Sequence, residues 1–247
     1  MTYCVGLLVE DGLAMIADTR TNAGVDNISS YRKLHVTEVP GDRVITLATA
    51  GNLSVTQTAL AMVREGLKLP DSDELQTLET VPSLFRAAQL VGHAIKQVRR
   101  EISPSLEAEN LVTDASVLLG GQIGKGPMAL YLIYSQGNFI ECQPDTPYMQ
   151  IGEFKYGKPI LDRALHPDTP LPEAVKLGLI SFDSTLRSNV SVGLPLDMIV
   201  IKKGELTGEK RRLENDDPYF RDLGQRWSQA LAEAHHNMPS PPWFSET

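Results

Sequence analysis

Two apolar runs close to the N-terminus place the strongest constraint on the fold. Residues 3–9 (YCVGLLV) and 13–17 (LAMIA) are separated by Glu10-Asp11-Gly12, and Asp-Gly between two apolar runs is a strong signal for a β-hairpin. The second run lacks the polar alternation of a strand with one wet face, so both of its faces should be covered. The sequence therefore predicts an antiparallel hairpin inside a layered structure.

The rest of the chain contains further strand and helix patterns. Strands are expected at 33–39, 43–51, 113–121, 127–135, 138–142, 148–152 and 197–202, and helices at 52–69, 82–102, 154–165, 171–186 and 217–236. Two halves, each with strands followed by helices, indicate two stacked sheets flanked by helices. We therefore expect an α+β fold of the four-layer αββα sandwich type.

The composition changes after Lys203, from mixed apolar patterns to charged and polar residues. This change predicts one main domain over residues 1–203 and a C-terminal helical and Pro-rich extension over residues 204–247. The final HNMPSPPWFSET carries Trp243 and Phe244. It is either disordered or an arm that docks on a neighbouring subunit.

Charge and cysteine content exclude several classes of protein. A net charge of −8 and no basic stripe argue against a nucleic-acid partner. No basic segment precedes the first apolar run and no stretch is long enough to span a bilayer, so we expect a cytoplasmic protein without a membrane partner. Cys4 and Cys142 lack the spacing of a zinc site, and two cysteines are too few for a disulfide framework, so both are interpreted as core residues.

Removal of Met1 would give Thr2 a hydroxyl and a free α-amine, which together are a nucleophile and a base. Asp18 comes close to this terminus in either register of the hairpin. A turn at Asp11-Gly12 places Asp18 opposite Val5, and a turn shifted by one residue places it opposite Tyr3. Lys33 is the nearest cation along the chain, although Arg32 remains an alternative.

A buried ammonium near Thr2 would favour proton loss from the hydroxyl and from the amine, whose ordinary pKa is about 7.7–8.0. The motifs MTYCVG, DTRTNAGVDNIS and TAGNLSVTQ resemble the proteasome β-subunit family of N-terminal nucleophile hydrolases. Within that family they are most similar to the bacterial ancestral β-subunit group called Anbu. The motif agreement covers roughly residues 2–60 and 185–200.

The resemblance implies a role for each matching residue. Thr2 would be the nucleophile, Asp18 would orient Lys33, and Lys33 would lower the pKa of the nucleophile. Gly51 would offer a backbone N–H to the oxyanion, and Ser191 would hydrogen-bond the terminal amine.

Two positions depart from the family pattern. Ser188 stands where the family has an aspartate, and Glu153 stands where a serine is usual. These departures concern the proton relay and not the nucleophile, and they are compatible with weak or altered activity.

The sequence thus predicts a threonine peptidase or amide hydrolase that needs no metal or organic cofactor. We expect it to act on peptide or amide substrates and to associate with copies of itself, as a ring or a spiral. The alternative is a non-catalytic structural subunit of a proteasome-like assembly. The local alternatives also stay open: a strand-end turn capped by Asp18, a charged strand edge at Lys33, and a helix end formed by Ser188 and Ser191.

Overall fold

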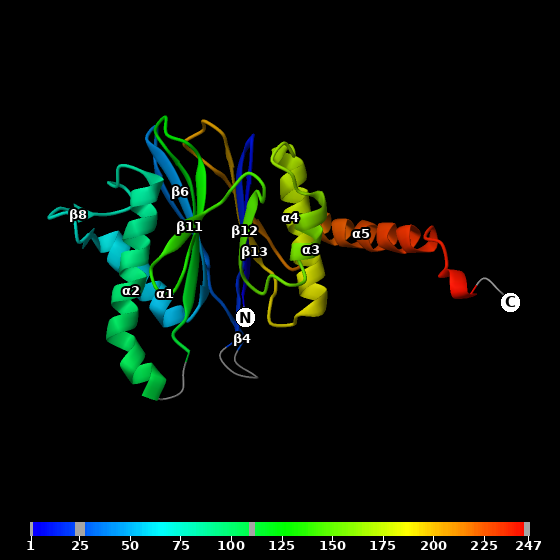
Figure 1. Ribbon diagram of the computed structural model, residues 1–247, viewed down its shortest axis with the longest axis horizontal. Helices are drawn as coiled ribbons and strands as arrows, with labels where there is room; N and C mark the ends of the chain where they lie inside the picture. The colour runs from blue at the N-terminus through cyan, green and yellow to red at the C-terminus, as the bar shows by residue number, and fades with distance from the viewer. Residues whose placement is uncertain (1, 23–27, 109–111, 245–247) are drawn as a thin grey trace.

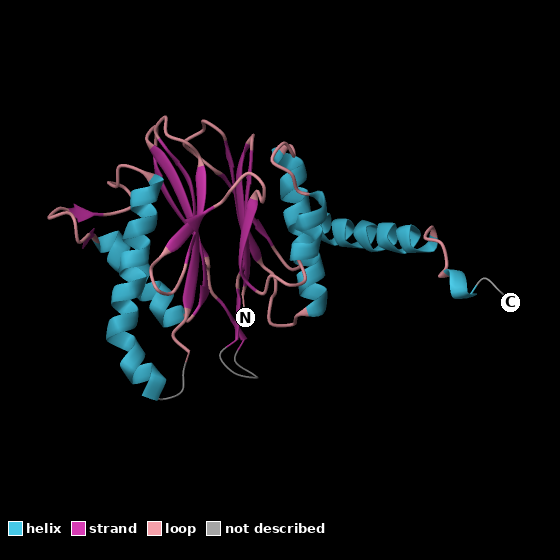
Figure 2. Ribbon diagram, in the orientation of Figure 1, coloured by secondary structure: helices cyan, strands magenta, loops and turns pink. Residues whose placement is uncertain are grey.

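The computed structural model describes residues 2–22, 28–108 and 112–244. Two large antiparallel sheets form its centre, with helices packed on their outer faces (Figure 2). The α+β class predicted from the sequence is confirmed.

The first sheet contains the N-terminal hairpin and has the strand order β12-β1-β2-β13-β14. Its strands are β1 (Tyr3–Val9), β2 (Gly12–Asp18), β12 (Tyr148–Gly152), β13 (Leu196–Lys202) and β14 (Glu209–Leu213). The hairpin register pairs Cys4 with Ala17 and Val9 with Gly12, so Glu10 and Asp11 make the turn. Of the two registers left open by the sequence, the shifted one occurs, and Asp18 comes opposite Tyr3.

The second sheet has the strand order β11-β10-β9-β6-β5. Its strands are β5 (Leu34–Val39), β6 (Arg43–Gly51), β9 (Ala115–Ile123), β10 (Ala129–Ile133) and β11 (Phe139–Glu141). The predicted hairpin formed by β5 and β6 is present, with Val39 paired to Arg43 around a Pro40-Gly41-Asp42 turn. Two small hairpins lie outside these sheets, and the sequence patterns did not predict them. One pairs β3 (Arg20–Asn22) with β4 (Ile28–Ser30), and the other pairs β7 (Leu67–Lys68) with β8 (Leu75–Gln76).

Helices cover the outer face of each sheet (Figure 1). They are α1 (Leu53–Glu65), α2 (Leu84–Ala108), α3 (Lys158–Ala164) and α4 (Leu171–Ser188); a further helix, α5 (Pro218–His236), projects away from the sheets. One apolar cluster joins α1 and α2 to the second sheet, and another joins α3 and α4 to the first. Helix α1 ends earlier than the apolar periodicity predicts because Gly66, at φ +103°, terminates it and leads into β7.

A third apolar cluster fills the space between the two sheets and explains the unbroken apolar character of β2. It combines side chains from both sheets, such as Met15 of β2 and Leu118 of β9. Two glycines make room for this packing. A Cβ on Gly6 would lie 2.8 Å from Leu130, and one on Gly120 would lie 2.6 Å from Leu13.

Helix α5 leaves the body of the molecule (Figure 1). Only Phe220 and Gly224 of this helix are buried. Gly224 allows the close approach to α4, because a Cβ there would lie 2.4 Å from the Asp183 carboxylate. The rest of the helix faces solvent, which agrees with its polar composition.

Candidate active site

The carboxylate of Asp18 and the ammonium of Lys33 form a buried ion pair at the end of the N-terminal hairpin. Lys33 Nζ lies 2.6 Å from Asp18 Oδ1, and neither side chain is appreciably exposed. Lys33 Nζ also donates to the carbonyl of Arg20 at 2.6 Å. Arg32, the alternative cation, is exposed, so Lys33 is the partner of Asp18.

Three donors hold the Asp18 carboxylate in place. Besides Lys33, the N–H groups of Tyr3 and Gly193 donate to it, at 3.1 and 3.4 Å. Burial raises the pKa of Asp18, and the Lys33 ammonium and the two backbone donors oppose that rise. The shifted hairpin register is what brings Tyr3 next to this carboxylate.

A cavity of about 320 Å³ opens beside the ion pair. Thr2, Lys33, Gly51 and Gly152 are among the residues that line it, together with Thr21, Thr49, Ala50, Leu53 and Thr56. The N-terminal threonine and the buried lysine therefore share one cavity with the glycine expected at the oxyanion.

Gly51 adopts a backbone conformation that other residues rarely take. Its φ is +98°, and a Cβ would lie 2.2 Å from the carbonyl oxygen of Asp114. The next residue, Asn52, caps α1 by accepting from the N–H groups of Ser54 and Val55. The end of β6 and the start of α1 are thus fixed at the cavity wall.

The loop that follows α4 reaches the ion pair through its backbone. Gly193 bonds Asp18, while the guanidinium of Arg20 donates to the carbonyls of Val190 and Val192, at 2.8 and 3.5 Å. Ser191 is part of this loop and is half-buried, and its N–H donates to Asn189 Oδ1 at 2.9 Å. Ser188 is exposed at the end of α4 and does not line the cavity.

Glu153 and Asn189 form a buried polar pair that the sequence analysis did not assign as a unit. Asn189 Nδ2 donates to Glu153 Oε2 at 3.1 Å, and the N–H of Glu153 donates to the carbonyl of Thr2 at 2.7 Å. The sequence offers a weak signal only: Asn189 lies between Ser188 and Ser191, and 36 residues separate it from Glu153.

Comparisons with solved structures identify the family. The chain is 45% identical to an Anbu (Gly-1) mutant from Hyphomicrobium sp. strain MC1, with a TM-score of 0.89 and coverage of 98% of this chain and 99% of that one. It is 42% identical to Anbu (ancestral beta-subunit) from Yersinia bercovieri, with a TM-score of 0.88 over 97% and 98% of the chains. The chain belongs to the Anbu family.

A third Anbu relative comes from Pseudomonas aeruginosa and is described as a helical assembly of the Anbu complex. It is 43% identical, with a TM-score of 0.90, and 99% of this chain matches all of that one. Neither the protein-family models nor the curated proteins gave a match. The resemblance inferred from the sequence motifs is therefore confirmed by the solved structures.

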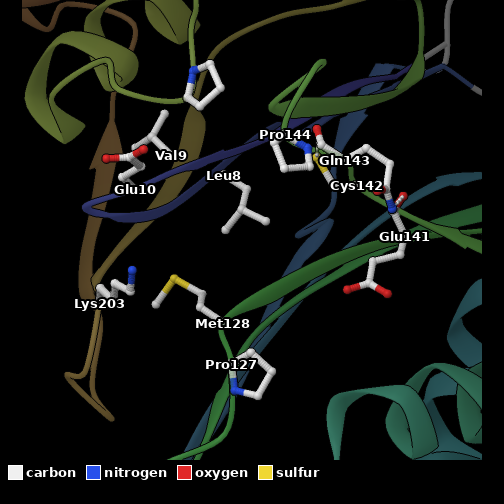
Figure 3. Close-up of a pocket in the computed structure, with 11 residues that line it drawn as sticks. Leu8, Val9, Glu10, Pro127, Met128, Glu141, Cys142, Gln143, Pro144 and Lys203 are labelled. Atoms are coloured by element: carbon white, nitrogen blue, oxygen red, sulfur yellow. Dashed lines mark hydrogen bonds between the residues drawn. The ribbon is translucent and has the colours of Figure 1, made fainter.

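A second, larger cavity of this Anbu chain lies at the other end of β1, beside the hairpin turn (Figure 3). It measures about 600 Å³ and contains Cys142 among apolar, proline, polar and charged side chains. Burial, followed by the nearby Glu141 carboxylate, raises the pKa of the Cys142 thiol to about 12. The thiol stays protonated near neutral pH and is a poor nucleophile.

Within the described ranges of this Anbu chain, no group of three or more His, Cys, Asp or Glu side chains could hold a metal ion. Over the same residues, none of the helices has both the length and the apolar character needed to cross a membrane.

Proposed function

We propose that this Anbu chain is a threonine peptidase or amide hydrolase whose nucleophile is Thr2 after removal of Met1. The observation that carries the proposal is the shared cavity, in which Thr2 and Gly51 lie beside a lysine ion-paired to a fully buried aspartate. A buried cation next to a hydroxyl favours the alkoxide form, which is the activation that a threonine nucleophile needs.

In the proposed mechanism, Thr2 Oγ attacks the carbonyl carbon of an amide, and the Thr2 α-amine accepts the hydroxyl proton, directly or through a water. The N–H of Gly51 stabilises the oxyanion. The C–N bond then breaks, and the departing amine takes up the proton. Water hydrolyses the resulting ester and restores Thr2. Asp18 and Arg20 occupy two of the three N–H donors of Lys33, which leaves the third for Thr2 Oγ.

The same proposal covers the finer description of the fold and the assembly. The two sheets with helices outside each would be the αββα sandwich of N-terminal nucleophile hydrolases. Residues 1–203 would form that domain, and residues 204–247 the extension.

The helical assembly of the P. aeruginosa relative supports self-association of this chain. The proposed substrate is a peptide or another amide. A cytoplasmic location stays a prediction from the sequence.

Intact mass and covalent labelling test the proposed function. We expect purified protein to lack Met1 and to react at Thr2 with a peptide epoxyketone, which needs a hydroxyl and a free amine on one residue. Thr2→Ala should abolish labelling, and Glu173→Gln, on an exposed part of α4, should leave it unchanged. Retained Met1, or a label elsewhere than Thr2, would favour the non-catalytic structural subunit.

A further inference from the structure

Glu153 lies beside Thr2 and carries a carboxylate that the mechanism above does not use. Its N–H bonds the carbonyl of Thr2, one step beyond the Tyr3–Gly152 pair that ends the ladder between β1 and β12. The two backbones are in close contact at this point, because a Cβ on Gly152 would lie 1.9 Å from the Thr2 carbonyl oxygen. Glu153 is thus fixed next to the terminal residue.

The Glu153 carboxylate is also held at its far end. The side chain is 7% exposed, and Asn189, 9% exposed, donates to its Oε2. Asn189 is oriented in turn by the N–H of Ser191. A buried carboxylate normally has a buried charged partner. Here the charged partner is the ammonium of Lys155, which lies 3.6 Å from Oε1 but belongs to a mostly exposed side chain. Such an exposed lysine compensates a buried charge only weakly.

Removal of Met1 would leave a free α-ammonium on Thr2, the residue whose carbonyl the Glu153 N–H bonds. We propose that Glu153, oriented by Asn189, is a positioning residue that binds the α-ammonium of Thr2 electrostatically. This inference rests on the proposed function, because it requires the free terminus. The charged groups around Thr2 then form two sets. The Lys33–Asp18 pair lies at the cavity, and the Glu153–Lys155 pair lies just beyond the end of β12.

The two sets act on the donor and on the acceptor of the same proton transfer. The Lys33 ammonium favours loss of the proton from Thr2 Oγ, whereas Glu153 favours the ammonium that forms when the α-amine accepts that proton. A carboxylate here would therefore stabilise the product of the proton transfer. Ser188 has a neutral hydroxyl and cannot supply this charge, so the acidic group would come from Glu153 in place of the aspartate of the family motif.

Glu153→Gln tests the inference because the amide can keep the contact with Asn189 while the charge is removed. We expect a lower pKa of the Thr2 α-amine and a fall in kcat/KM of about tenfold or more, with the acid limb of the pH profile moved to lower pH. Glu153→Asp should restore part of the amine pKa and part of kcat/KM, and Asn189→Ala should lower both quantities, as Glu153→Gln does. The matched control is Glu173→Gln, in which the amine pKa and kcat/KM should be the same as in the unmodified chain.

The α-amine can be titrated without any substrate. Competitive acetylation over a pH series, followed by mass spectrometry of the N-terminal peptide, gives its apparent pKa. The same amine pKa in the Glu153→Gln variant and in the control would overturn the inference even if the protein is an active hydrolase. A lowered amine pKa in a protein that no epoxyketone labels would support Glu153 as the carboxylate of the terminus and refute the proposed function alone. Retained Met1 would overturn both.

Discussion

At the scale of single residues, the Lys33 ammonium is the main charge that compensates the buried Asp18 carboxylate. Lys33→Met leaves that carboxylate without its ion-pair partner, and we expect the free energy of unfolding to fall by about 3–5 kcal/mol near neutral pH. The double variant Asp18→Asn/Lys33→Met removes both charges and should recover most of the loss. Urea unfolding of the three proteins measures the difference.

The same variant has a pH dependence with a defined sign. Burial already raises the pKa of Asp18, and loss of the ammonium removes the main influence that lowers it. An acid whose pKa is raised on folding stabilises the folded state below its unfolded pKa, and this contribution is lost as the pH rises through the folded pKa. The destabilisation by Lys33→Met should therefore be smaller at about pH 4.5 than at about pH 8. An equal loss at both pH values would contradict this interpretation.

A second, independent prediction of pH dependence concerns His35, on β5 of the second sheet. Burial, then Arg64 and Arg32, lower the pKa of His35. The folded chain binds this proton less strongly than the unfolded chain, so stability decreases as the pH falls through the ordinary histidine value toward the lowered one. His35→Gln should reduce the loss of unfolding free energy between about pH 7.5 and about pH 5.5. Parallel pH profiles for the variant and the parent would refute the prediction.

The sequence could predict some members of the candidate site and not others, for physical reasons. Thr2 and Asp18 are brought close by the geometry of the first hairpin, and Lys33 follows a short way along the chain, directly before β5. Glu153 follows β12 and Asn189 follows α4, so the two residues meet only because α4 packs on the sheet that contains β12. A linear sequence pattern does not encode this packing. The structure also decides between Lys33 and Arg32, because burial distinguishes two adjacent basic residues that composition treats alike.

At the scale of elements, long patterns were predictable and short polar ones were not. The helices α2 and α4 follow from apolar residues at three- and four-residue steps, and the hairpin of β5 and β6 from its turn. Strand β14 (EKRRL) is charged and mostly exposed, so it has no apolar alternation to reveal it; its pairing with β13 defines it. The register of the first hairpin needed the structure, since Gly12 tolerates either turn.

The loop after α4 is held to the sheet by the guanidinium of Arg20. A Cβ on residue 193 would lie 2.1 Å from Arg20 Nε, so Gly193→Ala should displace the loop and lower the free energy of unfolding by about 1–3 kcal/mol. In an Arg20→Ala background the same substitution meets no guanidinium and should cost less. Thermal or urea unfolding of the four proteins forms a double-mutant cycle, and strict additivity would show that the contact does not matter.

At the scale of the whole molecule, α5 contributes little to the core and offers much surface. Phe220 and Gly224 anchor it on α4, whereas Tyr219, Leu231 and Met238 are exposed apolar side chains on or just beyond the helix. Exposed apolar residues on a projecting helix are typical of contacts between subunits. We therefore expect α5 to serve the proposed self-association more than the stability of a single chain.

Truncation after Asp216 separates these two roles. The shortened chain should keep its fold and lose about 2–3 kcal/mol, since the burial of Phe220 is the main apolar contact removed. It should also sediment as a smaller species than the full chain at equal concentration. Leu231→Lys is the matched point variant: it leaves Phe220 and Gly224 in place, so it should weaken assembly without changing the unfolding free energy. If both proteins assemble like the full chain, the subunit contacts must lie on the rest of the molecule, and the projection of α5 needs another explanation.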